Sequence, residues 1–260
     1  MSSNIKVVSK ETISRLVKDI SYIKKNPLIE NGIHYIHDDE DMLKGYALII
    51  GPEETPYFGG FYLFEFVYPT DYPFSPPKVT FLTNNGELRF NPNLYTKGKV
   101  CVSILNTWTG DQWSSCQTLN SVLLTLCSLL NDNPLLNEPG VRHNHPDCEK
   151  YNKVVAYGNI LVAICGIVNK KYLPKQFEIF NEIIKESFMK NYENILSLVE
   201  KNINVKDTLF VGLYNMRICI NYESLKDELL KCFNKINNEI NNKINNEINN
   251  KQSNEIISII

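Results

Sequence analysis

The chain has 260 residues, 43% of them hydrophobic, with a formal net charge of -2 and a sequence pI near 6.1. Such a chain can build one sizeable core plus an extension or a second small domain, and its weak charge does not favour nucleic acid as a partner. Seven scattered cysteines, no signal-peptide pattern and no apolar run of membrane-spanning length predict a reducing, intracellular setting without a membrane partner.

The first predicted element is an amphipathic helix over residues 11–25, and Asn26 with Pro27 ends it. Arg15 and Lys18 belong to its basic outer face, which in the simplest interpretation is a solvated surface. Apolar residues recur at three- and four-residue spacing on the other side of the helix, at Ile13, Leu16, Val17, Ile20 and Ile23.

Strand signals follow between residues 32 and 82. Runs rich in β-branched and aromatic residues, separated by polar or proline-rich connections, cover residues 33–36, 43–50, 61–68 and 78–82. Short connections predict an antiparallel meander and therefore an α+β fold. Phe74 stands in the proline-rich loop before the last strand, either as an exposed apolar contact or as a plug of the core.

The candidate site is the stretch 90–101, Phe-Asn-Pro-Asn-Leu-Tyr-Thr-Lys-Gly-Lys-Val-Cys. Pro92 and its flanking asparagines break regular structure, and residues 96–99 form a second turn. Cys101 therefore falls on a loop, eight residues after Asn93, which is a setting typical of reactive thiols.

A buried helix is predicted over residues 119–130, preceded by a segment that holds both tryptophans of the chain, Trp108 and Trp113, which we expect to pack. A polar loop over residues 137–149 leads into another helix near Tyr151. Asp147 precedes that helix, where an acid acts as a cap or as a first-turn charge.

A zinc site is a second interpretation of the polar loop, because His143, His145 and Cys148 lie close in sequence. Their spacing is irregular and no fourth ligand follows nearby, so we expect no metal.

The remainder is predicted to be helical. A wholly helical stretch from Val154 to about Asn202 includes a long amphipathic helix after Pro174, and beyond Lys235 an Ile-Asn-Asn-Glu/Lys pattern repeats. That repeat is a low-complexity tail, helical at best, because asparagine is a poor helix former. We therefore divide the chain into a core domain (1–170), a helical extension (171–235) and a tail (236–260).

These motifs resemble those of the ubiquitin-conjugating enzyme family. Its active-site loop carries His-Pro-Asn and, eight residues after the Asn, the thioester-forming cysteine; Pro92, Asn93 and Cys101 fall in that register, with Asn91 in place of the His. Residues 72–79 match its Tyr-Pro-Phe-x-Pro-Pro-Lys-Val signature. Residues 107–110 and 137–140 resemble the long, Z-type members.

The resemblance implies the UBC fold: an N-terminal helix, a four-stranded antiparallel meander, an active-site loop and C-terminal helices, here with a helical extension. It implies that Cys101 carries ubiquitin, or a ubiquitin-like modifier, as a thioester. Asn93 then stabilises the oxyanion or ties the loop together, and Asp147 orients or deprotonates the incoming lysine. Asn91 is expected to be a structural substitution that leaves activity intact.

The resemblance also implies partners. Arg15 and Lys18 would meet the ubiquitin-activating enzyme, and Phe74 and Ser115 would belong to the two halves of the surface that a RING-type ligase grips. Protein substrates receive the modifier. No cofactor is implied, since ATP is used by the activating enzyme, and the cytoplasm, with or without the nucleus, is the expected location.

Two alternatives compete with a conjugating enzyme. A cysteine protease needs a histidine against Cys101, and the loop residues His143 and His145 leave this open. A non-catalytic ubiquitin-binding module on the same fold is the more serious alternative. Such variants lack the cysteine, so the presence of Cys101 with Asn93 and Asp147 favours the enzyme.

Overall fold

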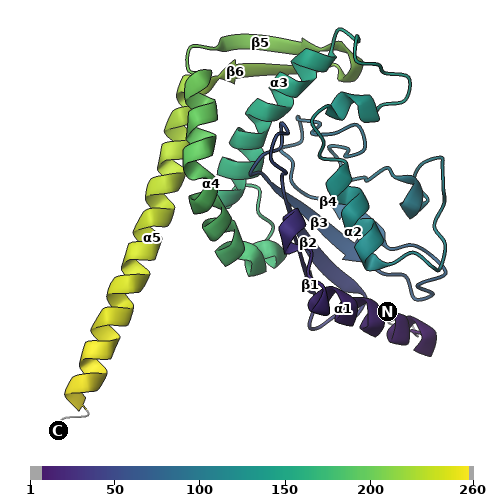
Figure 1. The fold of residues 1–260 in the computed structure, drawn as a ribbon, viewed down its shortest axis with the longest axis horizontal. Helices are drawn as coiled ribbons and strands as arrows, with labels where there is room; N and C mark the ends of the chain where they lie inside the picture. Colours follow the sequence, from purple (N-terminus) through teal and green to yellow (C-terminus); the bar gives the residue numbers. More distant parts are fainter. Residues whose placement is uncertain (1–7, 258–260) are drawn as a thin grey trace, which may run out of the picture.

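The computed structural model describes residues 8–257, with the backbone alone at residue 244 and over residues 246–257. A four-stranded sheet is flanked by helices, and a hairpin and a long helix complete the chain (Figure 1). The main elements are α1 (Lys10–Lys25), β1 (Ile33–His37), β2 (Lys44–Ile50), β3 (Phe61–Val67), β4 (Lys78–Phe81), α2 (Leu119–Ser128), α3 (Cys148–Gly158), α4 (Asn181–Lys201), β5 (Lys206–Val211), β6 (Met216–Asn221) and α5 (Tyr222–Ile257).

The sheet has the order β1-β2-β3-β4 with every pair antiparallel, so the predicted meander and the α+β class are confirmed. Each strand lies within one residue of its predicted ends. The alternating apolar pattern fixes the register, for example Ala47 opposite Phe64, because a slip by one residue would turn every core side chain to the other face.

Both faces of the sheet are buried. Ala47, Phe64 and Phe66 pack in one cluster with apolar residues of α1 and α2. On the other face, β2 and β3 residues pack with the extension in a second cluster that includes Tyr46, Leu48, Phe61, Leu63, Phe177, Phe180, Phe188 and Ile195. Figure 1 accordingly shows α2 and α4 on opposite sides of the sheet. Double coverage explains why five successive residues of β2 are buried.

The helices α1 and α2 begin where side chains satisfy their free N–H groups. Ser9 Oγ accepts from Thr12 N at 3.0 Å at the start of α1. Thr118 and Ser121 form a reciprocal capping box at the start of α2. The predicted buried face of α2 is confirmed at Leu119, Val122, Leu123 and Leu126.

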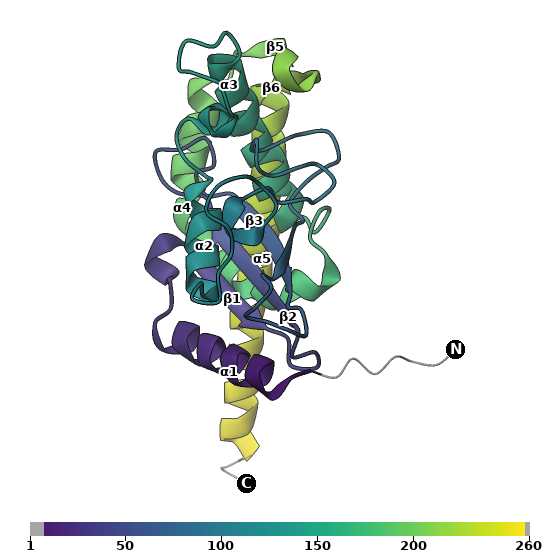
Figure 2. The same cartoon turned by 90° about the vertical axis from the view of Figure 1, so that its right-hand side faces the viewer.

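The prediction of an all-helical extension is wrong between residues 206 and 221. There the chain forms the β5–β6 hairpin, with Val211 opposite Met216 and a short 3-10 turn over Gly212–Tyr214. Val211 and Met216 are buried in the first cluster and Ile220 in the second. Alternating apolar residues with a glycine-containing turn are a hairpin signal. Both views place this hairpin at the end of α3, away from α1 (Figures 1 and 2).

The helix α5 runs without a break through the predicted domain boundary at residue 236. Ile236 is buried, Ile240 packs beside it, and Lys185 Nζ on α4 lies 2.9 Å from Glu239 Oε2. The predicted tail is thus helical as far as Ile257, and residues 258–260 lie outside the described part. Within residues 8–257, no helix is long and apolar enough to cross a membrane.

Candidate active site

The loop that carries Cys101 is closed by paired bonds to Asn93. The Cys101 N–H donates to the Asn93 carbonyl at 2.8 Å, and Asn93 Nδ2 donates to the Cys101 carbonyl at 2.6 Å. Leu94 and Val100 form an antiparallel bridge between them, and Gly98 takes φ +87° in the turn. The sequence spacing thus brings Asn93 and Cys101 side by side, as predicted.

Cys101 is only 2% exposed, so the expected accessible thiol is not found in this conformation. The next segment folds back on itself: Thr107 Oγ1 accepts from the Val102 N–H at 2.9 Å and donates to the Val102 carbonyl at 3.0 Å. By contrast, Cys116 and Cys219 are exposed. A reaction at Cys101 therefore requires a local displacement around the thiol.

Of the two roles proposed for Asn93, the structure contains the hydrogen bond that ties the loop and leaves the oxyanion role as a prediction. The bond from Nδ2 to the Cys101 carbonyl is the loop-tying role. Asn93 Oδ1 is buried and has no hydrogen-bond partner among the described residues, which is uncommon for a buried amide oxygen. An amide nitrogen has two hydrogens and this bond uses one of them, so the donation of the other to an oxyanion stays a prediction.

Asn91 is a structural residue, as expected. It is fully buried, and its Nδ2 donates to Tyr57 Oη at 3.0 Å and to the Leu129 carbonyl at 2.7 Å. Its Oδ1 accepts from the Asn93 N–H at 2.9 Å. Asn91 therefore fastens the active-site loop to the end of α2.

Replacing Asn91 by leucine is expected to lower the free energy of unfolding by about 3 kcal/mol, because buried polar groups lose their partners. Chemical denaturation measures this loss. Asn144 is exposed and provides the control, since Asn144→Leu should change stability by less than about 0.5 kcal/mol. Equal midpoints for both variants would contradict the structural role of Asn91.

Asp147 lies at the N-cap position of α3, but the expected capping bond is absent. The carboxylate instead turns to the extension: Oδ2 accepts from the Leu213 N–H at 2.9 Å, and Oδ1 lies 3.9 Å from Lys150 Nζ. The residue is 7% exposed. Its proposed action on an incoming lysine stays a prediction, with the β5–β6 turn now part of its environment.

Arg15 is not on a solvated face. Its Nε lies 3.1 Å from both carboxylate oxygens of Asp19, and its side chain is 18% exposed. The other guanidinium nitrogens donate to the backbone carbonyls of Ser115 and Gln117. Arg15 thus ties α1 to the loop before α2, whereas Lys18 is exposed as predicted. Contact with an activating enzyme stays a prediction for both.

The two loops of the expected ligase surface are joined in the structure. Phe74 is 70% exposed, so it is not a core plug. Trp113 Nε1 donates to the Pro73 carbonyl at 2.7 Å, which fastens the loop of Phe74 to the segment that holds Ser115. Trp113 packs as expected, but Trp108 is exposed, so the packing prediction is wrong for it. Ligase binding itself stays a prediction.

The histidines do not form a ligand cluster. Among the residues whose side chains the structure describes, no three His, Cys, Asp or Glu side chains gather as they would around a metal ion. His145 Nδ1 accepts from the Asp147 N–H at 3.2 Å, and Cys148 Sγ lies 3.5 Å from the Arg142 carbonyl. His34 and His37 lie on β1, where burial lowers their pKa values.

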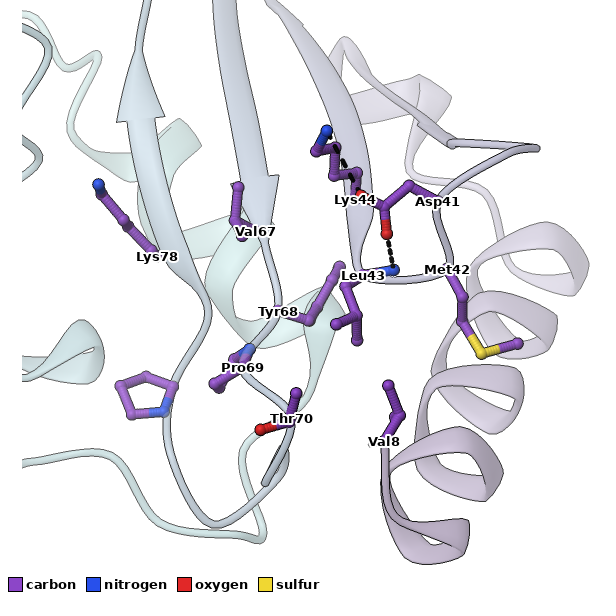
Figure 3. Close-up of a pocket in the computed structure, with 11 residues that line it drawn as sticks. Val8, Asp41, Met42, Leu43, Lys44, Val67, Tyr68, Pro69, Thr70 and Lys78 are labelled. Carbon is purple, nitrogen blue, oxygen red and sulfur yellow. Dashed lines mark hydrogen bonds and ion pairs between the residues drawn. The ribbon is translucent and has the colours of Figure 1, made fainter. Parts of the chain in front are cut away.

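A surface groove of about 760 Å³ lies between the start of α1 and the sheet, with Val8, Met42 and Lys78 among its lining residues (Figure 3). None of the predicted site residues lines it. A second groove, of about 450 Å³, is bordered by β4 and by residues 97–100, immediately before Cys101. The second groove is thus the one that adjoins the candidate site.

Comparison with known proteins identifies the family. Residues 15–158 match the model "Ubiquitin-conjugating enzyme". The chain is 43% identical to Ubiquitin-conjugating enzyme E2 Z of Xenopus tropicalis over 189 residues, which are 71% of this chain and 59% of the relative. The human E2 Z is 43% identical over 186 residues, 70% of this chain and 51% of the relative.

A more distant relative is the Probable ubiquitin-conjugating enzyme protein 17 of Caenorhabditis elegans, 37% identical over 202 residues, 72% of this chain and 27% of the relative. The chain thus spans between about a quarter and three-fifths of the length of these relatives. The matched region holds the whole meander, the Asn93–Cys101 loop, α2 and α3. The chain belongs to the ubiquitin-conjugating enzyme family.

Proposed function

We propose that this protein accepts ubiquitin, or a ubiquitin-like modifier, from an activating enzyme as a thioester on Cys101 and transfers it to a lysine amine of a protein substrate. The observation that carries the proposal is the loop in which Asn93 and Cys101 bond to each other, inside the region that matches the family model.

The first step is an exchange of thioesters. The Cys101 thiolate attacks the carbonyl carbon held by the activating enzyme; the new S–C bond forms and the other thiol leaves with the electron pair of the old one. No ATP is needed on this chain, because the activating enzyme has already used it to activate the carboxyl group.

The second step is aminolysis. The neutral lysine nitrogen attacks the thioester carbon, negative charge develops on the carbonyl oxygen, and the C–S bond then breaks with the electron pair leaving on Cys101. The free N–H of Asn93 is our candidate donor to the oxyanion. The excess amine proton passes to Asp147 or to water, and a proton restores the thiol.

The proposed partners follow from the exposed surfaces. The helix α1 presents Lys18 with the exposed apolar side chains Ile13 and Val17, which suits an activating enzyme. The loop of exposed Phe74, fastened to the segment of Ser115, suits a RING-type ligase. All seven cysteines are free, which agrees with a reducing compartment, the cytoplasm or nucleus.

A loading assay tests this function. The protein is incubated with an activating enzyme, ATP and each of several modifiers, then run on a non-reducing gel with and without added thiol. We expect an ATP-dependent adduct that thiol removes. If no modifier and no activating enzyme gives an adduct, the enzyme proposal fails, and ATP-independent binding of free ubiquitin would support the non-catalytic module instead.

A further inference from the structure

The turn between β5 and β6 reaches the candidate active site although it is more than 100 residues away in sequence. Val211 and Met216, on either side of the turn, are buried in the same apolar cluster as Phe90 and Val100 of the active-site loop. The hairpin also packs along α3. The turn residues Leu213 and Tyr214 are therefore held in a defined position beside the site.

Tyr214 packs on an arginine at the root of the active-site loop. The Arg89 guanidinium carbon lies 4.4 Å from the centre of the Tyr214 ring and 4.0 Å from that of Tyr95. Arg89 also donates to the Pro92 carbonyl. Its Nε is buried without a hydrogen-bond partner among the described residues, so the two rings are neighbours that stabilise the guanidinium where water does not reach it.

Two hydrogen bonds extend the contact of the turn to other segments of the site. Tyr214 Oη donates to Glu138 Oε2 at 2.6 Å. Burial and the Glu138 carboxylate raise the pKa of Tyr214 above its ordinary value. The Leu213 N–H donates to Asp147 Oδ2 at 2.9 Å.

We propose that the β5–β6 turn is a positioning element for transfer from Cys101, with Tyr214 holding Arg89 and the active-site loop, and the Leu213 N–H holding Asp147. The inference rests on the proposed function and adds what the C-terminal extension contributes to that site. Loading does not use Asp147, whereas aminolysis also needs a positioned carboxylate to accept the amine proton, so the turn acts more strongly on the second step.

The test separates loading from discharge. Single-turnover discharge of the preloaded protein to free lysine is expected to be at least ~10-fold slower in Tyr214→Ala, because misplacing a catalytic group is costly even at ~1 Å. Loading should change by less than about 3-fold. Tyr214→Phe keeps the ring on Arg89 and loses only the bond to Glu138, so it should recover most of the rate.

A second pair of variants isolates the backbone donor. Leu213→Pro removes the N–H that donates to Asp147. A proline can adopt the φ of a 3-10 turn, so the backbone of the turn can be kept. Leu213→Pro should slow discharge as Tyr214→Ala does. Leu213→Ala keeps the N–H, so its discharge rate should fall much less. Phe210→Ala is the matched control, since this aromatic on β5 is exposed and lies beside Arg217 rather than on Arg89.

A readout without any modifier distinguishes this inference from the proposed function. Alkylation of Cys101 by iodoacetamide, followed by peptide mass spectrometry, reports how firmly the loop is held. We expect faster alkylation in Tyr214→Ala and the wild-type rate in Phe210→Ala.

Unchanged alkylation and unchanged discharge in Tyr214→Ala would overturn the inference. Equal losses of loading, discharge and thermal stability would also overturn it, since the turn would then serve folding alone. Failure of the wild-type protein to load refutes the proposed function itself.

Discussion

Replacing Cys101 by alanine is expected to abolish the thiol-sensitive adduct completely, because no other atom in the proposed mechanism can hold the modifier. Cys101→Ser should give an adduct that resists thiol but is cleaved by hydroxide, since an oxygen ester replaces the thioester. Non-reducing gels of the loading reaction, with thiol and alkali treatments, measure both outcomes.

The matched control is Cys116→Ala, which removes an exposed thiol and should load at the wild-type rate. Because Cys101 is buried, its replacement can disturb packing. Circular dichroism therefore checks that the Cys101 variants are folded. A thiol-sensitive adduct that survives in Cys101→Ala would contradict the assignment of the carrier cysteine.

Replacing Asn93 by alanine is expected to slow discharge to free lysine by about 10²- to 10³-fold, the usual loss when one oxyanion donor is removed. Loading should fall much less if the second N–H of Asn93 acts mainly on the aminolysis step. Single-turnover discharge of the preloaded variant, beside its loading rate and its unfolding midpoint, measures the difference.

Asn85 provides a matched control for an asparagine that only ties a loop. Its Oδ1 accepts from the N–H groups of Glu87 and Leu88 at 3.2 and 2.9 Å. Asn85→Ala should therefore lower stability and leave discharge unchanged. If Asn93→Ala behaves in the same way, Asn93 serves loop structure alone and the oxyanion role is wrong.

Local patterns in the sequence were sufficient to predict the sheet and the active-site loop. The strands were found because their side chains alternate with the pleat, and α2 because Val122, Leu123 and Leu126 follow helical spacing. Two turns placed Cys101 on a loop, and the resemblance to the family placed Asn93 in the same site. Each of these features depends on residues close in sequence.

Contacts distant in sequence could not be predicted in this way. Arg15 was expected on a solvated face, yet it bonds to a carbonyl 100 residues away. A cap or first-turn charge was one of the two roles considered for Asp147, but its carboxylate accepts from a backbone N–H of the extension instead. Neither partner leaves a signal near the residue concerned, because both depend on how the extension and the loops pack.

The β5–β6 hairpin had a local sequence signal, but the contacts of its turn had none. The residues of β5 and β6 do alternate, with Val211, Met216 and Ile220 turned inward, so the strand signal was present but short. Tyr214 carried no motif of its own, and the stretch that begins at Arg89 gave no sign of this partner. Only the fold brings the aromatic ring, the guanidinium and Tyr95 together.

The position of the modifier in the loaded wild-type protein decides whether Cys101 is the carrier. Peptide mass spectrometry under non-reducing, mildly acidic conditions identifies which of the seven cysteines carries the modifier's C-terminal remnant. We expect the remnant on the buried Cys101. A remnant on the exposed Cys116 or Cys219 instead would contradict it.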